Sequence, residues 1–229
     1  MNEQEITFNK ERTEIVIASN VRGAYDIPFG IHSINVRAFV NCTEMTSIHI
    51  PDSVQKIWHC AFDNCSSLTE VIIPHSVIYI GQGAFYICES LITFKFPHKL
   101  VKIGAYSFNN CKSLVSVDIP NSVEEIGEEA FSECSKLQSL YIGENVKYIG
   151  NNAFSRCISL AQVHLKGKIP PKVSEELANS QYTSIIENKK DIFYFTVAPL
   201  LCFVPKGAYE IYHNDKYWRN HAIIEEGWL

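Results

Sequence analysis

Hydrophobic residues recur along most of this 229-residue chain in one order that repeats every 23 residues. Read from Cys65 to Phe85, a single unit has the form C-x-x-L-x-x-V-x-I-P-x-x-V-x-x-I-G-x-x-A-F. A fixed period of this length indicates a protein whose repeats stack on one another. The most regular residue is a phenylalanine, found at Phe39, Phe62, Phe85, Phe108, Phe131 and Phe154.

Each unit predicts two short extended segments. In L-x-x-V-x-I, Val71 and Ile73 share one face of a strand and Ile72 faces the other way. Pro74 ends this strand because it lacks a ladder donor. Val77 begins the second segment, and Gly81 is expected to permit the next bend. One unit cannot bury these side chains alone, so the pattern predicts a mainly β solenoid.

This frame resembles the BspA-like leucine-rich repeat proteins of bacteria, and the resemblance runs from Ile27 to Leu165. It implies a right-handed superhelix of short parallel strands. It also implies surface adhesion or recognition of a host protein, the roles attributed to secreted members. Three positions depart from the frame: 58–60 replaces the usual bend, Ser107 stands for alanine, and Gly143 stands for proline.

Both ends of a solenoid need a cap. Apolar runs at Ile6–Phe8 and Ile15–Ile17 predict a β-hairpin over the N-terminal end. The period fails after Leu165, and Cys202–Pro205 copies Val71–Pro74. Val204 lies 39 residues after Leu165 instead of 23, which leaves 16 extra residues.

The segment from Val204 to Glu225 resembles the C-terminal module of bacterial BspA-like proteins, so a strand-and-helix cap is expected. In this cap Tyr209, Tyr212, Tyr217 and Trp218 are predicted to be core residues rather than a ligand site. The predicted domains are an N-terminal cap over 1–26, a solenoid over 27–169, and an insertion with a closing cap over 170–229.

Composition is that of a globular protein, with 46% hydrophobic and 20% charged residues. The net charge of -5 and the lack of any basic stripe argue against a nucleic-acid partner. No apolar run approaches the roughly 20 residues that a membrane span requires. As written, the chain begins with polar and acidic residues, which favours the cytoplasm. Cell-surface or secreted localisation is the alternative if a leader was removed.

Six of the eight cysteines follow the repeated phenylalanines by three residues. Column packing explains this spacing without disulfides, because free cysteine behaves as a small hydrophobe. Cys60 and Cys202 lie off the column and are the candidates for oxidation.

The chain carries no recognisable catalytic set, so we predict that it is not an enzyme and needs no cofactor. The serines occupy repeat turns, and no G-x-S-x-G elbow is present. His75 and His98 occupy one position of consecutive units, and two imidazoles there could share a metal ion. A third ligand is not evident, so solvated loop histidines are the favoured interpretation.

A partner surface is expected where the predicted strands face outward. The middle outward row contains His49, Ile72, Lys95, Asp118, Tyr141 and His164, and the row before it includes Glu70 and Gln162. The alternative is the insertion 174–195, with Tyr182 and the apolar residues Phe193, Tyr194 and Phe195.

The sequence therefore predicts a non-catalytic module that binds an unidentified protein, in the setting of a bacterial surface adhesin. The first alternative is an intracellular structural or regulatory scaffold. The second is a metal-binding or enzymatic protein that uses His75 and His98.

Overall fold

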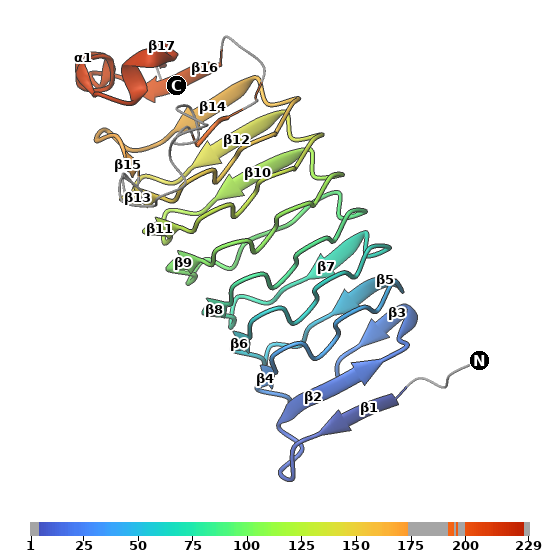
Figure 1. Ribbon diagram of the computed structural model, residues 1–229. Helices are drawn as coiled ribbons and strands as arrows, with labels where there is room; N and C mark the ends of the chain where they lie inside the picture. Colours follow the sequence, from blue (N-terminus) through green and yellow to red (C-terminus); the bar gives the residue numbers. More distant parts are fainter. Residues whose placement is uncertain (1–4, 174–191, 195, 197–199, 227–229) are drawn as a thin grey trace, which may run out of the picture.

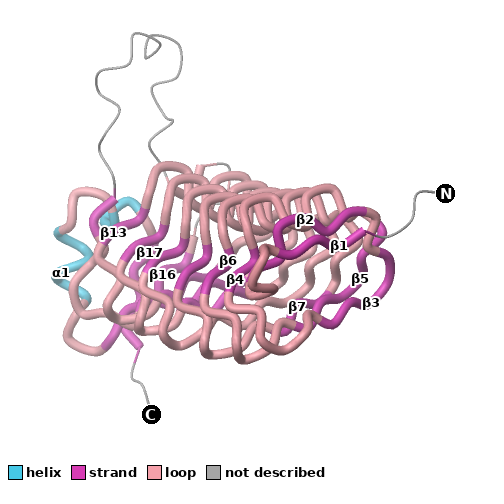
Figure 2. Tube along the Cα trace, turned by 90° about the horizontal axis from the view of Figure 1, so that it is seen from below, coloured by secondary structure: helices cyan, strands magenta, loops and turns pink. Residues whose placement is uncertain are grey.

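The chain forms a mainly β solenoid of about eight turns, as predicted. A computed structural model describes residues 5–173, 192–194, 196 and 200–226. Figure 1 shows the coils stacked in sequence order, with the N-terminal strands at one end of the stack and a small helical cap at the other, and Figure 2 shows α1 opposite β1 and β2 in a view turned by 90°.

The V-x-x-I segments make one sheet of nine strands, most of them only two residues long. In order across the sheet these are β1 (Glu5–Phe8), β2 (Glu14–Ser19), β4 (Ser33–Ile34), β6 (Lys56–Ile57), β8 (Tyr79–Ile80), β9 (Lys102–Ile103), β11 (Glu125–Ile126), β13 (Tyr148–Ile149) and β15 (Lys172–Val173). β1 and β2 pair antiparallel, which confirms the N-terminal hairpin. The other neighbours pair parallel, and from β4 to β13 the same repeat positions lie opposite one another.

The L-x-x-V-x-I segments line another face, which we call the outer sheet. It consists of a three-stranded part, β3 (Arg22–Asp26), β5 (Glu44–His49) and β7 (Glu70–Ile72), and a five-stranded part. The five strands are β10 (Ser116–Ile119), β12 (Ser139–Ile142), β14 (Gln162–Leu165), β16 (Leu201–Pro205) and β17 (Ala222–Glu226). All pairs are parallel.

The outer sheet is interrupted at residues 91–97, which are described and form no strand. The prediction of a strand in this unit was therefore wrong. Phe94 and Phe96 occupy the positions that Val71 and Ile73 hold in the preceding coil. Both rings are buried and pack on Phe108, at 4.5 and 5.4 Å between ring centroids. We attribute the interruption to the larger volume of these two rings, because a close-packed interior does not absorb extra volume without moving backbone.

The six phenylalanines form one continuous stack inside the solenoid, as the spacing requires. Successive ring centroids are 5.1–5.4 Å apart, and the rings are nearly parallel. Each phenylalanine N–H also donates to the carbonyl of the residue just before the next phenylalanine, for example Phe85 to Ser107 at 2.8 Å. Backbone pairing and ring stacking therefore enforce the same register.

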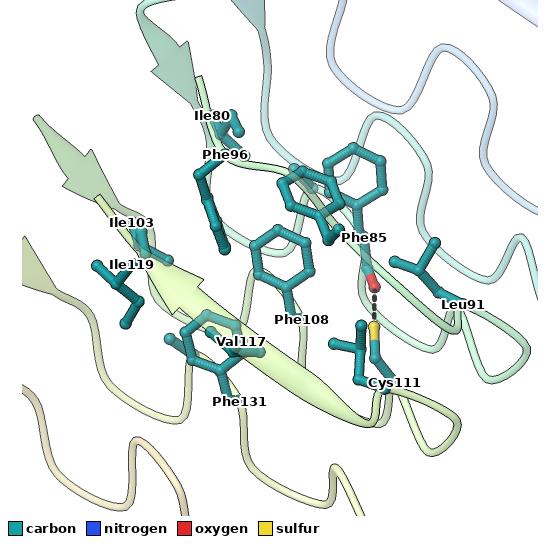
Figure 3. Packing of buried hydrophobic residues seen from close by; sticks show 14 of the residues in the cluster. Ile80, Phe85, Leu91, Phe96, Ile103, Phe108, Cys111, Val117, Ile119 and Phe131 are labelled. Atoms are coloured by element: carbon teal, nitrogen blue, oxygen red, sulfur yellow. Dashed lines mark hydrogen bonds between the residues drawn. The ribbon is translucent and has the colours of Figure 1, made fainter. Parts of the chain in front are cut away.

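The cysteine column is held by hydrogen bonds that the sequence reasoning did not anticipate. Each column thiol donates to a main-chain carbonyl of the coil before it, as Cys111 Sγ does to the Phe85 oxygen at 3.3 Å (Figure 3). The other five thiols repeat the contact at 3.2–3.3 Å. The structure describes all eight cysteines, and none of them forms a disulfide. A thiol fits this position because it fills an apolar space and also pairs a buried carbonyl.

The glycine of the repeat serves close packing between coils rather than the bend predicted for it. Gly127 has no left-handed φ, yet a Cβ atom there would lie 2.4 Å from the Ala105 nitrogen of the coil before it. A Cβ atom at Gly150 would likewise lie 2.4 Å from the Glu128 nitrogen. Trp58 occupies this position in an earlier coil and keeps the equivalent backbone bond, from its N–H to the Ile34 oxygen.

The C-terminal cap closes the stack with buried aromatic side chains. α1 (Tyr209–Asn214) and the 3-10 turn η1 (Trp218–Asn220) contribute Tyr212 and Trp218, which are fully buried. Tyr217 is partly buried, but Tyr209 is exposed and stacks on His213, so its assignment to the core was wrong. None of the described helices has the length and apolar character that a membrane crossing requires.

The chain after the insertion rejoins the repeat in the predicted place. Cys202 and Phe203 of β16 pair with Val163 and His164 of β14. Phe193 stacks on Phe154 at 5.7 Å and extends the phenylalanine column by one ring. Both sheets run across the proposed domain boundaries, through β3 into the three-stranded part and through β15 at the other end.

Each coil turns through left-handed backbone at two fixed positions. One of these positions holds Asn41, Asn64 and Asn110, but Ile87 occupies it with a φ of 57°. Left-handed backbone is unfavourable for a β-branched residue and tolerable for asparagine.

Replacing Ile87 with asparagine should therefore raise the free energy of unfolding by about 1 kcal/mol, measured by urea denaturation. The reverse change Asn64→Ile is the matched control. It should lower the free energy, because it adds the strain and removes the bond from Asn64 Nδ2 to Asn41 Oδ1. A destabilising Ile87→Asn would contradict the strain argument.

Thiol labelling should distinguish the column from Cys60. Burial raises the pKa of Cys65, Cys88 and Cys111 above the usual thiol range, so little thiolate forms at pH 8. Cys60 is partly exposed, whereas Cys202 is buried and no longer a candidate for ready oxidation. A disulfide reagent should modify one thiol in the folded protein and all eight in urea. Cys60→Ser should remove the early reaction, and rapid labelling of column thiols would refute the assignment.

Candidate functional site

The outer sheet aligns outward-facing side chains into rows, because its strands pair parallel and in register. His49 lies opposite Ile72 on the neighbouring strand. In the other part of the sheet, Asp118 lies opposite Tyr141, and Tyr141 lies opposite His164 on the next strand. Lys95 is exposed, but its segment lacks strand pairing. The row is therefore divided at Lys95 into an N-terminal part and a C-terminal part, and Figure 1 shows the matching interruption of the outer sheet between β7 and β10.

The N-terminal part of the row is polar and solvated. His49 Nδ1 lies 3.5 Å from Asp26 Oδ1, and both side chains are more than half exposed. Glu70 is exposed, and Ile72 stands 53% exposed beside it. Exposed ion pairs of this kind contribute little to the free energy of unfolding, because solvent screens the two charges.

The C-terminal part forms a ladder of stacked rings. The Tyr141 and His164 ring centroids are 4.5 Å apart with 12° between planes, and His164 and Phe203 are 4.6 Å apart with 9°. Ile224 extends the row across β17 and is 38% exposed. We call Tyr141, His164, Phe203 and Ile224 the aromatic strip.

Charged side chains border the strip at one end and along one edge. Asp118 lies at the end of the row beside Tyr141, and Lys166 Nζ donates to Asp118 Oδ1 at 2.8 Å and lies 6.0 Å from the Tyr141 ring centroid. Glu226 lies along the same edge as Lys166, and its Oε1 is 3.1 Å from His164 Nδ1. The His164 side chain is only 13% exposed, since rings cover both of its faces. Strip and rim together make an ordered, partly apolar surface with charged edges.

Comparison with known proteins identifies the family. The pattern described as "BspA type Leucine rich repeat region" matches the sequence in six copies, over residues 24–104 and 80–192. The chain belongs to this family. No curated protein matches the sequence.

Solved structures of bacterial leucine-rich repeat proteins resemble this BspA-type chain. A leucine-rich repeat protein of T. pallidum shares 31% identity, with 70% of this chain and 78% of that chain covered and a TM-score of 0.62. A leucine rich cell surface protein of Faecalibacterium prausnitzii shares 23%, with 97% and 70% covered and a TM-score of 0.55. The pneumococcal vaccine antigen PcpA shares 17%, with 97% and 46% covered and a TM-score of 0.56. The last two support the fold alone.

Two members of the strip were not among the sequence-predicted site residues. Phe203 and Ile224 enter the row only because β16 and β17 add to the sheet after the insertion. The sequence held a signal for Phe203, since aligning Cys202–Pro205 with Val71–Pro74 places it at the Ile72 position. Ile224 carries no repeat signature. Gln162 lies on β14 in the preceding row and is exposed.

The alternative site in the insertion is partly excluded. Phe193 is only 2% exposed and belongs to the core of this BspA-type solenoid, so it is not available to a partner. Tyr194 is partly exposed on the turn side of the coils. Tyr182 and Phe195 lie outside the described residues.

His75 and His98 stack face to face, with ring centroids 4.5 Å apart and 22° between planes. Within the described part of the BspA-type chain, no three His, Cys, Asp or Glu side chains gather closely enough to hold a metal ion. Structural zinc sites have four protein ligands, and catalytic sites have three. The geometry therefore gives no support to a metal centre built on these two histidines.

The ring ladder predicts energetic coupling between its neighbours. Tyr141→Ala and His164→Ala should each lower the free energy of unfolding. A double-mutant cycle should give a coupling of about 0.5–1.5 kcal/mol, the range for stacked aromatic pairs. Tyr141 and His49 lie in separate parts of the outer sheet and provide the control pair. The losses in free energy of unfolding from their two alanine substitutions should be additive. Additive losses for Tyr141 and His164 would argue against a stabilising stack.

Proposed function

We propose that this chain is a non-catalytic protein-binding module that receives its partner on the aromatic strip. The observation that carries the proposal is the ordered stack of Tyr141, His164 and Phe203 at the outer surface. Aromatic groups with few rotatable bonds bury much area on binding and lose little entropy, and they dominate the binding energy of many interfaces.

The charged rim supports a protein partner with complementary charges. Asp118 lies at one end of the rings and Lys166 and Glu226 lie along one edge, so all three would remain at the border of a contact centred on His164. Interfaces commonly combine an apolar centre with a polar border of this kind, and the border contributes to orientation and association rate.

The other outward residues predicted from the sequence are less suited to anchor a partner. His49, Glu70 and Ile72 belong to the separate three-stranded part, and Lys95 lies in the interruption. Gln162 borders the strip and is proposed to contact the partner at its edge. Leucine-rich repeat proteins of this family are generally non-catalytic, which agrees with a binding role.

We place the module at a bacterial cell surface, in an adhesive role. The support is the family, because BspA-type leucine-rich repeat proteins are often surface or secreted proteins. The alternative is an intracellular scaffold. Its partner would be a cytosolic protein, whereas the partner of an adhesive module would be a surface-exposed protein.

Affinity capture tests the proposal. The immobilised protein is offered separately to surface-exposed and cytosolic fractions of candidate partner cells. Tyr141→Ala and Phe203→Ala should each reduce recovery of the captured protein about tenfold, which corresponds to roughly 1.4 kcal/mol.

Ile72→Ala is the matched control, because it removes an exposed apolar side chain from the same row outside the strip. It should recover as much partner as the unmodified protein. Equal recovery by all variants would refute the strip as the binding surface. Capture from the cytosolic fraction alone would favour the scaffold.

A further inference from the structure

A polar hollow of about 340 Å³ lies on the turn side of the solenoid, where neither sheet runs. Its floor consists of Asn109, Ser132 and Ser155, which are 5%, 4% and 5% exposed. Tyr86 and Tyr194 stand at its two ends. We call this hollow, lined by these residues and their neighbours, the turn-side trough. Its volume falls at the lower end of the range for small-molecule sites, about 300–1,000 Å³.

The trough follows from the repeat register. Tyr86, Asn109, Ser132 and Ser155 are 23 residues apart and hold one position of successive coils. Tyr194 takes the same position after the insertion, because Arg156 N–H donates to its carbonyl as Glu133 N–H donates to that of Ser155. Large side chains at the ends and small ones between them leave a space about three coils long. At about 4.8 Å per coil, the trough is elongated rather than round.

The floor presents ordered hydrogen-bonding groups. The Ser132 and Ser155 hydroxyl oxygens are 2.8 Å apart, so one hydroxyl donates to the other. The pair keeps one hydroxyl hydrogen and free lone pairs that could bond to a ligand. Asn109 donates from Nδ2 to Glu129 Oε2 at 3.2 Å and accepts from Asn110 Nδ2 at 2.8 Å. Asn152 Oδ1, on the trough lining, is shielded from solvent without a hydrogen-bond partner among the described residues. Buried polar atoms are normally paired, so this oxygen would gain a donor if the Asn152 side chain turned toward a molecule bound in the trough.

The charges of the trough disfavour anions. Glu133 pairs with Arg156 at 2.5 Å, whereas Glu129 bonds to the neutral amide of Asn109. Burial, followed by the nearby Glu128, raises the pKa of Glu129. With Glu129 ionised, two carboxylates face one guanidinium, so the lining has a net negative charge and phosphate, sulfate and uronate groups would be repelled.

We propose that the turn-side trough binds a short neutral oligosaccharide. Hydroxyl groups both donate and accept, which matches the mixed serine, asparagine and glutamate lining. The tyrosines at the ends have an apolar ring face and a polar tip, which suit the C–H faces and hydroxyls of a sugar ring. The long axis of the trough favours a chain of sugars over a single compact ligand. This site lies apart from the aromatic strip, so sugar binding and partner capture can fail independently.

Saturation-transfer NMR with a panel of neutral trisaccharides tests the proposal. The panel contains maltotriose, cellotriose, mannotriose and tri-N-acetylchitotriose, with spermidine and sulfated cellotriose as charged probes. At least one neutral trisaccharide should bind with a Kd of about 1 mM or tighter, and the sulfated compound should not.

Variants locate the binding. Tyr86 and Tyr106 both line the trough, and replacing either with alanine should raise the Kd at least fivefold. Two variants are used so that the test still holds if one of them misfolds. Tyr148→Ala is the control, since Tyr148 is a 51% exposed tyrosine on the nine-stranded sheet. Glu129→Gln keeps the shape and should change the Kd less than fivefold.

The proposal is overturned if no neutral trisaccharide binds, or if both trough variants bind as well as the unmodified protein. Preferential binding of spermidine that Glu129→Gln abolishes would also overturn it, because the trough would then be a cation site. Circular dichroism confirms that each variant is folded.

Discussion

Hydrogen bonding between successive coils at a constant register of 23 residues is the constraint on which the rest of the molecule depends. It operates on the two sheet faces and on the turn side, where each phenylalanine N–H reaches the next coil. The phenylalanine stack and the thiol bonds of the cysteine column require the same spacing. Since no coil buries its apolar side chains alone, stability is shared between neighbouring coils.

Strict register turns every repeat position into a row on the surface. Where successive side chains of a row do not stack, they are simply solvated, as His49 and Ile72 are. When successive coils place rings in one row, a stacked ladder forms, as at Tyr141 and His164. When large residues bracket small ones, a hollow forms, as between Tyr86 and Tyr194. The proposed partner surface and the proposed sugar site are thus two outcomes of one geometric rule.

The scaffold tolerates departures where the interior can adapt. Ser107 replaces alanine and satisfies its buried hydroxyl by donating to the Gly104 and Gly81 carbonyls. The bend at Trp58 keeps the backbone bond of its glycine counterparts. Larger side chains in the interior are tolerated less well, because the two rings Phe94 and Phe96 lie where the outer sheet is interrupted. The insertion is accommodated because Phe193 resumes the ring column and β16 resumes the sheet.

The 23-residue pattern by itself determined the solenoid, the residues in its core and the rows of the outer sheet, and the apolar runs Ile6–Phe8 and Ile15–Ile17 determined the N-terminal hairpin. These properties are local or periodic, and alternation within a strand decides which side chains are buried. Only the tertiary structure decided that Phe203 and Ile224 join the strip, that Glu226 reaches His164, and that Phe193 is a core ring. It also revealed that contact between coils leaves no room for a Cβ atom at Gly127 and Gly150, and that small side chains between two tyrosines leave a trough. These features depend on how close non-neighbouring segments come, and side-chain volume and the path of the chain after residue 165 set those distances.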